Sequence, residues 1–358
     1  MIPTPMAEVL FVVGAAFLAA WVLSYLLHST VVCLGAIAIT RTWSVGAGDR
    51  ATMWRFVLIA PVVSASITAV GLSEAMPLTW DLSRLAPQAL VDWRAGVFVL
   101  MPLLVVPFVL FAGLKAGHTL LRQVFGKRRR APAVLQDEAA LLASAVGCRV
   151  PRVTLSEAAG VPAAIGLSEI CMPAALYASA PADERRALIA HEMGHLKRRD
   201  PLWFMVAGSL VRLTAFQPLN RIAMSRLREA SEDAADDVAV EATGNPVALA
   251  RGLARLATAI VALSGGAAAS GSPVVARVSR LLDGHRGPTP PRRRSTGVAL
   301  ATLALTIVVW FGPGVSANPE LVADRLPWLA SSKEEPNPRM LEVRRILRAW
   351  RDAINRAF

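Results

Sequence analysis

Apolar residues of this chain gather in four long stretches, which charged segments separate from one another. A helix needs about 20 mostly apolar residues to cross the hydrocarbon core of a bilayer, and each stretch is close to that length. The pattern therefore predicts four transmembrane helices, three before a long polar segment and one after it. The predicted spans cover about residues 9–30, 56–73, 95–114 and 296–317.

The long polar segment, residues 115–295, has the size of one soluble domain. The apolar spacing near 135–146 is typical of a helix, whereas 153–155 and 163–175 are short β-rich pieces punctuated by glycine and proline. A further helix is expected after Ser179, which suits an N-cap. We therefore predict a mainly α chain in which an α+β domain interrupts the membrane region.

The chain ends in a short tail whose last residues have an amphipathic helical pattern, with arginines opposite the apolar face. Such a helix packs against the spans, lies on the lipid surface or contacts a partner that delivers a signal, and the pattern does not choose among these. The predicted divisions of the chain are 1–114, 115–295, 296–317 and 318–358, and the apolar face of the tail consists of Met340, Val343, Leu347, Trp350 and Ile354.

Composition favours a membrane protein. Hydrophobic residues make up 54% of the chain, charged residues only 18%, and the mean hydropathy is +0.47, values outside the usual range of soluble domains. The net charge of +12 is compatible with nucleic-acid binding, but basic residues beside apolar spans more often record orientation and contact with anionic lipid. We therefore expect the lipid bilayer as a partner and no specific nucleic acid.

Basic residues flank the soluble segment on both sides, with runs at 127–130 and 292–294. Lys and Arg close to the spans are retained on the cytoplasmic side, so we predict that this domain is cytoplasmic. Four crossings then place both termini outside the cytoplasm, in a multi-pass protein of the cell membrane.

Candidate chemistry is concentrated in the sequence His-Glu-Met-Gly-His at residues 191–195. Positions four apart share a face of a helix, so His191 and His195 can bind one metal ion. Glu192 lies about 100° around the helix from His191, where its carboxylate can take a proton from metal-bound water. Two histidines on a solvated helix are the plain alternative, which the rarity of the pattern disfavours. We expect a single zinc ion.

Catalytic zinc usually has three protein ligands and one open position, so a third ligand is needed. The acidic stretch 229–237 offers one, because Glu232 and Asp236 are four positions apart and share a face of a helix. We predict that Glu232 binds the metal and that Asp236 orients an imidazole ligand. Glu229 and Asp233 are alternative ligands, and a solvated acidic helix face is the alternative without a function.

Residues 201–218 are apolar enough to be mistaken for another span, but Arg212 interrupts them and they are barely long enough to cross. A crossing there would put Glu232 and His191 on opposite sides of the bilayer. We therefore predict a helix that is buried in the domain or lies at the membrane surface.

The stretches HEMGHLKRRDPLW and REASEDAADDVAVEATGNPVALARGLARLA resemble the membrane zinc peptidases typified by the BlaR and MecR signal transducers, metallopeptidase family 56. The resemblance implies a cytoplasmic gluzincin domain after three spans and before a fourth. It also implies zinc ligands at His191, His195 and Glu232, with Glu192 as base and Asp236 behind an imidazole. HtpX-like proteases share both motifs and remain the alternative.

The best-known members of that family carry a large external penicillin-binding domain after the last span. Only about forty residues follow the predicted span here, so we expect no β-lactam sensing. The resemblance implies a zinc endopeptidase that hydrolyses a cytoplasmic protein, such as a transcriptional repressor, or itself, with 284–296 as a conceivable self-cleavage region. Substrate backbone is expected to pair with the extended piece 163–175.

Two classes other than proteases remain open at this point. One is a membrane receptor that uses zinc structurally, which the presence of Glu192 as a base disfavours. The other is a basic scaffold that holds anionic lipid or acidic partners, which does not explain the paired motifs.

Overall fold

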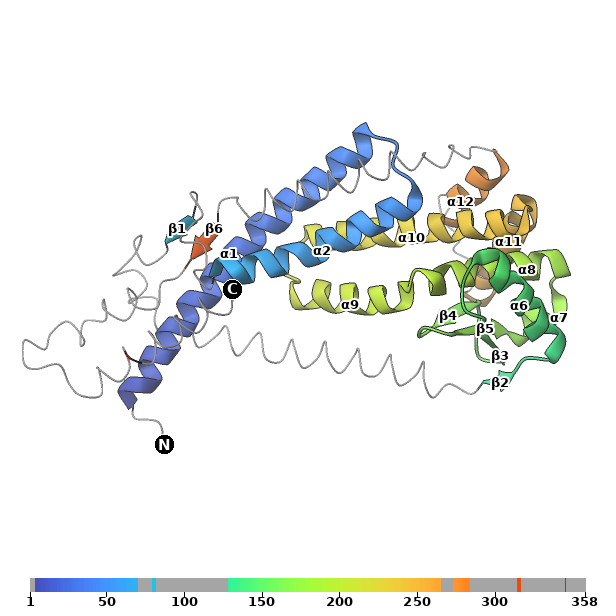
Figure 1. Ribbon diagram of the computed structural model, residues 1–358, viewed down its shortest axis with the longest axis horizontal. Coiled ribbons are helices and arrows are strands. Elements are labelled where there is room, and N and C mark those ends of the chain that lie inside the picture. The colour runs from blue at the N-terminus through green and yellow to red at the C-terminus, as the bar shows by residue number, and fades with distance from the viewer. Residues whose placement is uncertain are drawn as a thin grey trace, which may run out of the picture. The chain divides into compact units, whose positions relative to one another are not determined.

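The computed structural model describes residues 4–69, 79–81, 128–264, 273–283, 314–316 and 345. The chain forms two compact units, shown with their elements in Figure 1. The first unit comprises residues 1–38, 57–110 and 301–358, and the second comprises 39–56 and 111–300.

Two long apolar helices form the described part of the first unit, α1 (Thr4–Thr42) and α2 (Ala47–Ala69). The segments Leu18–Thr42 and Ala47–Thr68 are each long and apolar enough to cross a membrane. Within the first unit they are joined by polar contacts, such as the 2.9 Å contact between His28 Nδ1 and Ser64 Oγ. The predicted span at 9–30 falls within α1, and the one at 56–73 coincides with α2 as far as Ala69, beyond which residues 70–73 lie outside the described part of the chain.

The second helix begins earlier than predicted, at Ala47 rather than near residue 56. Residues 47–55 were excluded from the predicted span because Asp49, Arg50 and Arg55 are charged. A helix can nevertheless continue beyond the hydrocarbon core of the bilayer. The last turns of α1 and the first turns of α2 therefore belong to the second unit as residues 39–56.

Three predicted elements fall largely outside the described residues: the spans at 95–114 and 296–317, and the amphipathic helix of the tail. The end of the predicted fourth span is described, and it is not helical. Gly314–Ser316 is strand β6, which pairs in parallel with β1 (Thr79–Asp81). Pro313 precedes this strand, and a proline in that position disfavours continuation of a helix.

A four-stranded sheet lies at one end of the second unit, with the strand order β2-β3-β5-β4. The central strands β3 and β5 are parallel, and β4 runs antiparallel to β5 at the edge of the sheet. The sheet comprises β2 (Arg129–Arg130), β3 (Arg152–Ser156), β4 (Ala163–Ile165) and β5 (Glu169–Pro173). The single extended piece predicted at 163–175 is thus a hairpin, because Gly166 adopts a positive φ of 59° and turns the chain.

Seven helices are described within residues 128–283 of the second unit (Figure 1): α6, α7 and α8 contact the sheet, and α9 to α12 pack on α8 or on one another. Glycines at positive φ end two of them: Gly147 follows α6 and Gly244 follows α10. The helices are α6 (Ala133–Val146), α7 (Ala174–Ser179), α8 (Ala182–Lys197), α9 (Asp200–Leu213), α10 (Leu219–Thr243), α11 (Pro246–Ser264) and α12 (Pro273–Leu282).

Helix α8 lies at the centre of the core, in contact with α6, α10 and α11. The prediction that Ser179 caps it is wrong: Ser179 is the last residue of α7, and Pro181 occupies the N-cap. The largest fully buried side chains of the second unit come from α8 and the elements around it. They are Leu135, Ile170, Met172, Leu188, Ile189, Met193, Leu227 and Leu249.

Gly194 explains why α8 and α10 come so close. A Cβ atom at this position would lie 3.1 Å from the Cα atom of Ala235, closer than side chains normally approach a backbone. The absence of a side chain at Gly194 therefore lets α10 pass directly beside the histidines of α8.

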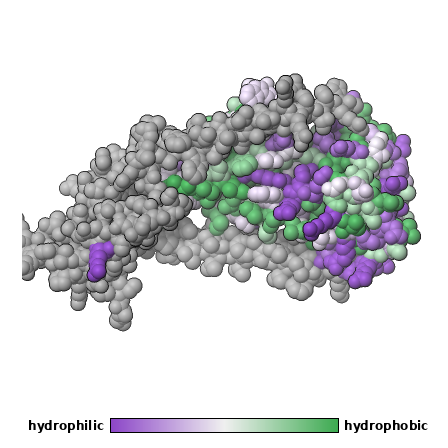
Figure 2. Space-filling model, in the orientation of Figure 1, coloured by the Kyte–Doolittle hydropathy of each residue, from purple (hydrophilic) through white to green (hydrophobic). Residues whose placement is uncertain are grey.

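The apolar stretch 201–218 forms α9 and a turn that leads into α10. His191, which precedes this stretch, and Glu232, which follows it, lie close together in the structure. This is what we expect if residues 201–218 do not cross a bilayer. Several of its apolar side chains are exposed, namely Leu202, Met205, Leu213 and Phe216. On the face shown in Figure 2, hydrophilic side chains lie along the outer edge of the end of the second unit that carries the sheet, with hydrophobic ones between them.

Candidate active site

Helix α8 places both motif histidines on one buried face. The two Nε2 atoms lie 3.3 Å apart, and the rings meet edge to face with centroids 4.9 Å apart. Glu192 is buried beside them. This arrangement follows from the helical period, which brings His191 and His195 together and turns Glu192 toward the side.

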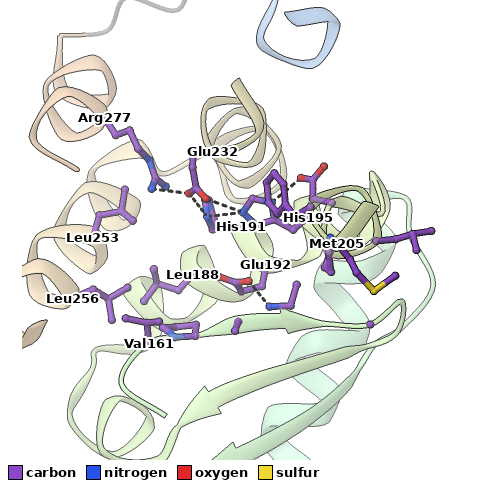
Figure 3. A pocket seen from close by; sticks show the side chains of 18 of the residues that line it. Val161, Leu188, His191, Glu192, His195, Met205, Glu232, Leu253, Leu256 and Arg277 are labelled. Atoms are coloured by element: carbon purple, nitrogen blue, oxygen red, sulfur yellow. Dashed lines mark hydrogen bonds and ion pairs between the residues drawn. The ribbon is translucent and has the colours of Figure 1, made fainter. Parts of the chain in front are cut away.

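Glu232 reaches the same point from α10 (Figure 3). Its carboxylate oxygens lie 3.5 Å from Nε2 of His191 and 3.7 Å from Nε2 of His195. One donor atom from each of the three residues falls within 4.8 Å of the other two. The structure thus brings together the three residues that the sequence nominated as ligands.

The other ring nitrogen of His191 faces Asp236, one turn beyond Glu232 on α10. Nδ1 of His191 lies 3.0 Å from Oδ1 of Asp236, whose side chain is fully buried. Arg277 of α12 holds that carboxylate with two hydrogen bonds, of 2.9 and 2.6 Å, and also lies 2.8 Å from Glu232. Asp236 therefore fixes the orientation of the imidazole, and Arg277 fixes Asp236.

The other ring nitrogen of His195 faces a second aspartate, which the sequence reasoning missed. Nδ1 of His195 lies 2.7 Å from Oδ2 of Asp200, and Asp200 is also fully buried. Arg198 and Arg55 both donate hydrogen bonds to the carboxylate of Asp200. Asp200 comes into position because Arg199 takes a left-handed conformation, with φ of 56°, between α8 and α9.

This donor set fits a divalent metal ion such as zinc. If the Nδ1 atom that faces each aspartate carries the hydrogen of a neutral imidazole, both Nε2 atoms present lone pairs to the same point as the Glu232 carboxylate. Acceptors that face one another this closely repel unless a proton or a cation lies between them. Two imidazoles and one carboxylate, each imidazole supported by an aspartate, match the ligand and support pattern of catalytic zinc sites.

The electrostatics of the metal-free site support the same conclusion. Burial disfavours the imidazolium form of His191, but hydrogen bonds to Asp236 and Glu232 outweigh it and raise the pKa of His191 to about 9. Burial likewise disfavours the carboxylate of Glu232, yet His191, His195 and Arg277 outweigh it and lower its pKa to about 2. At neutral pH the metal-free site therefore holds a negative Glu232 beside a protonated His191, and a bound cation would take the place of that proton.

Glu192 faces a cavity of about 640 Å³ beside the three ligand candidates. One of its oxygens accepts a 2.7 Å hydrogen bond from the backbone N–H of Ala164, on the edge strand β4. Apolar side chains from α8, α9 and α11 line the cavity, as Figure 3 shows for Leu188, Met205, Leu253 and Leu256. A carboxylate at this place can exchange protons with a molecule bound in the cavity.

The alternative ligands do not join this cluster. Glu229 pairs with Arg226 on the exposed side of α10, and Asp233 pairs with Arg50 of α2. The alternative interpretation of this segment as a solvated acidic helix face therefore holds for Glu229. It is wrong for Asp236, whose side chain is fully buried.

Sequence reasoning missed Asp200, Arg277 and Arg55. The only local signal was the Arg-Arg-Asp-Pro sequence directly after α8, in which Asp200 stands five residues beyond His195. Nothing in the sequence relates Arg277 or Arg55 to the motif, because each comes from a distant helix.

Comparison with known proteins gives a match to a family and a partial match to a curated protein. The family model described as BlaR1 peptidase M56 matches residues 15–265. A protein named "Protease HtpX homolog", from Aeropyrum pernix, is 33% identical over 130 residues, which are 34% of this chain and 40% of that protein. The chain thus spans less than half the length of this curated relative.

Proposed function

This chain belongs to the M56 family of membrane metallopeptidases, and from that premise we propose that it is an integral membrane zinc endopeptidase. The proposed substrate is a cytoplasmic protein or the chain itself. One observation carries the proposal: His191, His195 and Glu232 converge at a cavity that Glu192 also faces.

Each residue has a distinct task in this proposal. Bound zinc would polarise the substrate carbonyl and lower the pKa of water. Glu192 accepts the proton of the attacking water and delivers it to the leaving amine. His191, His195 and Glu232 hold the metal, while Asp236 and Asp200 keep the two imidazoles in the required tautomer and orientation.

The edge strand β4 supports the binding of an extended substrate. It has no strand neighbour on its outer side within the described sheet, and the cavity extends along Val161–Ala164. Substrate backbone that pairs with this edge would place a peptide bond beside Glu192, with limited demand on side-chain sequence. The N–H of Ala164, which now bonds to Glu192, is one of the groups available to that backbone.

The membrane arrangement proposed here has four spans, a cytoplasmic second unit and both termini outside. The two candidate spans and the family support a membrane protein, and the basic residues beside the second unit support its orientation. Cysteine labelling of both termini and of the second unit in intact cells measures this orientation directly.

A second candidate function, membrane-protein quality control of the HtpX type, is favoured by the partial match to the HtpX homologue. The two candidates differ in substrate. A quality-control protease degrades many misfolded proteins, whereas a signalling protease cleaves one protein at defined bonds. Comparing the cellular proteins that accumulate when Glu192 is replaced distinguishes them.

The proposal is tested with the full-length chain in detergent, using casein cleavage and self-cleavage as readouts. Glu192→Gln should keep the metal and lower the rate by about 10²–10⁴-fold, since general acid–base catalysis has that magnitude. Glu241→Gln, an exposed carboxylate on α10, serves as the matched control and should keep full activity. Full activity of Glu192→Gln would overturn the assigned role, and an intact chain in active preparations would exclude self-cleavage.

A further inference from the structure

The first turns of α2 belong to the same compact unit as the metal site, because residues 39–56 group with 111–300. Two arginines in these turns, Arg50 and Arg55, each pair with an aspartate that stands next to the site. Both pairs join segments far apart in the sequence, by 183 and 145 positions. Helix α2 is also one of the two candidate membrane spans.

Arg55 determines how the carboxylate of Asp200 is turned. Its guanidinium donates to Oδ1 of Asp200, while Oδ2 accepts from His195 and Arg198. The two oxygens thus have separate tasks, and holding Oδ1 leaves Oδ2 directed at the imidazole. The pair is buried, with 12% of the Arg55 side chain and none of the Asp200 side chain exposed.

The guanidinium of Arg55 is itself fixed in place. It lies over the ring of Trp203, 5.2 Å from the ring centroid, one turn along α9 from Asp200. A planar group that is stacked on one side and hydrogen-bonded at its edge has little freedom to rotate. Arg55 therefore transmits the position of α2 to the start of α9.

Arg50 makes the corresponding contact with α10. Its Nη2 atom lies 2.7 Å from Oδ2 of Asp233, the residue that follows Glu232. This pair is more exposed, at 34% and 22% of the two side chains, so it contributes less than the buried pair. Together the two arginines connect α2 to the segments that carry His195 and Glu232.

We propose that Arg55 is a positioning residue of the metal site: by holding Asp200, it lets α2 set the orientation of His195. The inference rests on the proposed function, since it takes His195 as a zinc ligand. It follows that a change in the position of these turns of α2 alters metal binding without any change in the ligands. Arg55 touches neither the metal position nor the cavity and is not a catalytic residue.

The test measures metal binding by the full-length chain in detergent, in a Glu192→Gln background so that no cleavage interferes. The probes are Zn²⁺, in competition with a chromophoric chelator, and Co²⁺, whose visible absorption reports coordination geometry. Arg55→Gln and Arg55→Lys are compared with Arg226→Gln, which removes an exposed ion pair on α10. Thermal unfolding of each metal-free variant shows that the measured protein is folded.

Arg55→Gln should weaken Zn²⁺ binding about tenfold, because replacing a residue that orients a metal ligand typically weakens binding by at least that factor. It should also change the Co²⁺ spectrum. Arg55→Lys keeps the charge but not the stacked plane, so it should recover part of this loss and remain about threefold weaker than the parent. Arg226→Gln should match the parent in both measurements.

Parent affinity and an unchanged Co²⁺ spectrum in Arg55→Gln would overturn the inference and leave the proposed function standing. If Arg55→Gln does not fold, Arg55→Lys decides in the same way, because parent-like binding there would overturn the inference as well. A parent protein that binds neither ion would remove the proposed function, and the inference with it.

Discussion

The two histidines proposed as zinc ligands are supported in the same way by different parts of the molecule. On the His191 side, a buried aspartate on α10 faces Nδ1 and is held by Arg277 of α12. On the His195 side, a buried aspartate at the start of α9 faces Nδ1 and is held by Arg198 and by Arg55 of α2. Each imidazole thus faces one aspartate with its Nδ1 atom, and that aspartate is in turn hydrogen-bonded to arginine.

The proposed metal site thus depends on two separate structural connections. The His191 side depends on α12, which follows α11 along the chain, whereas the His195 side depends on the first turns of α2, a candidate membrane span. The two histidines therefore have the same kind of polar partners, but they depend on different helices of the protein.

The largest expected effect comes from neutralising each aspartate in turn. Asp236→Asn and Asp200→Asn should each weaken zinc binding about 10–100-fold, because each removes the carboxylate that orients a ligand imidazole. Competition with a chelator measures the affinity. Similar losses would show that the two aspartates contribute equally to zinc binding. A variant without any loss would contradict the role given to its aspartate.

Titration should distinguish the two sides, because the pKa of His191 is raised to about 9 in the metal-free protein. A metal ligand must be a neutral imidazole, so below that pH zinc displaces a proton from His191. The apparent zinc affinity should therefore rise about tenfold per pH unit from pH 7 and level off near pH 9.

The same titration on variants provides the contrast between sides. Asp236→Asn removes a hydrogen bond that raises the pKa of His191, so its affinity should level off at a lower pH. Asp200→Asn leaves that hydrogen bond in place, so its affinity should level off at the pH of the parent. A titration that Asp236→Asn leaves unchanged would contradict the assignment of the proton to His191.

The close approach of α8 and α10 serves both sides at once, and Gly194 makes it possible. Gly194→Ala should lower the free energy of unfolding by about 1 kcal/mol, because the overlap with Ala235 exceeds the gain in helix propensity. It should also weaken zinc binding by moving Glu232 away from both histidines. Chemical denaturation and metal competition measure the two effects.

Gly208 on α9 is the matched control for this substitution. Among the described residues, a Cβ atom there would meet the side chain of Arg212 alone, at an ordinary contact distance of 3.5 Å, so Gly208→Ala should raise the free energy of unfolding by about 0.5–1 kcal/mol. Destabilisation of the same size in both variants would show that crowding against α10 is not the cause.

The smallest effect on stability and zinc binding is expected for a residue that contacts neither His191 nor His195. Glu229→Ala removes an exposed carboxylate that pairs with Arg226, and it should change the free energy of unfolding by no more than about 0.5 kcal/mol. Its zinc affinity should equal that of the parent. A large loss of zinc would return Glu229 to the list of candidate ligands.

Local periodicity explains which parts of the site could be predicted. The pairs His191 with His195 and Glu232 with Asp236 are each four positions apart on a helix, so their shared faces follow from sequence alone. Asp200 depends on a left-handed residue, and arginine at position 199 gives no signal for that conformation. Arg277 and Arg55 reach the site through tertiary packing, which no local pattern describes.

The fold shows the same division. The helix at 133–146 and the strand near 153–155 were predictable from their apolar spacing, and so were the first two apolar helices. The early start of α2 and the strand at the end of the predicted fourth span were not, because hydropathy marks where hydrocarbon can lie and not where a helix begins or ends.

Metal analysis of the purified full-length chain, with Glu232→Ala and Glu229→Ala measured beside the parent, shows whether His191, His195 and Glu232 hold a zinc ion. We expect one zinc ion per chain in the parent and in Glu229→Ala, and loss of zinc in Glu232→Ala. A parent chain without zinc, or full zinc content in Glu232→Ala, would contradict this expectation.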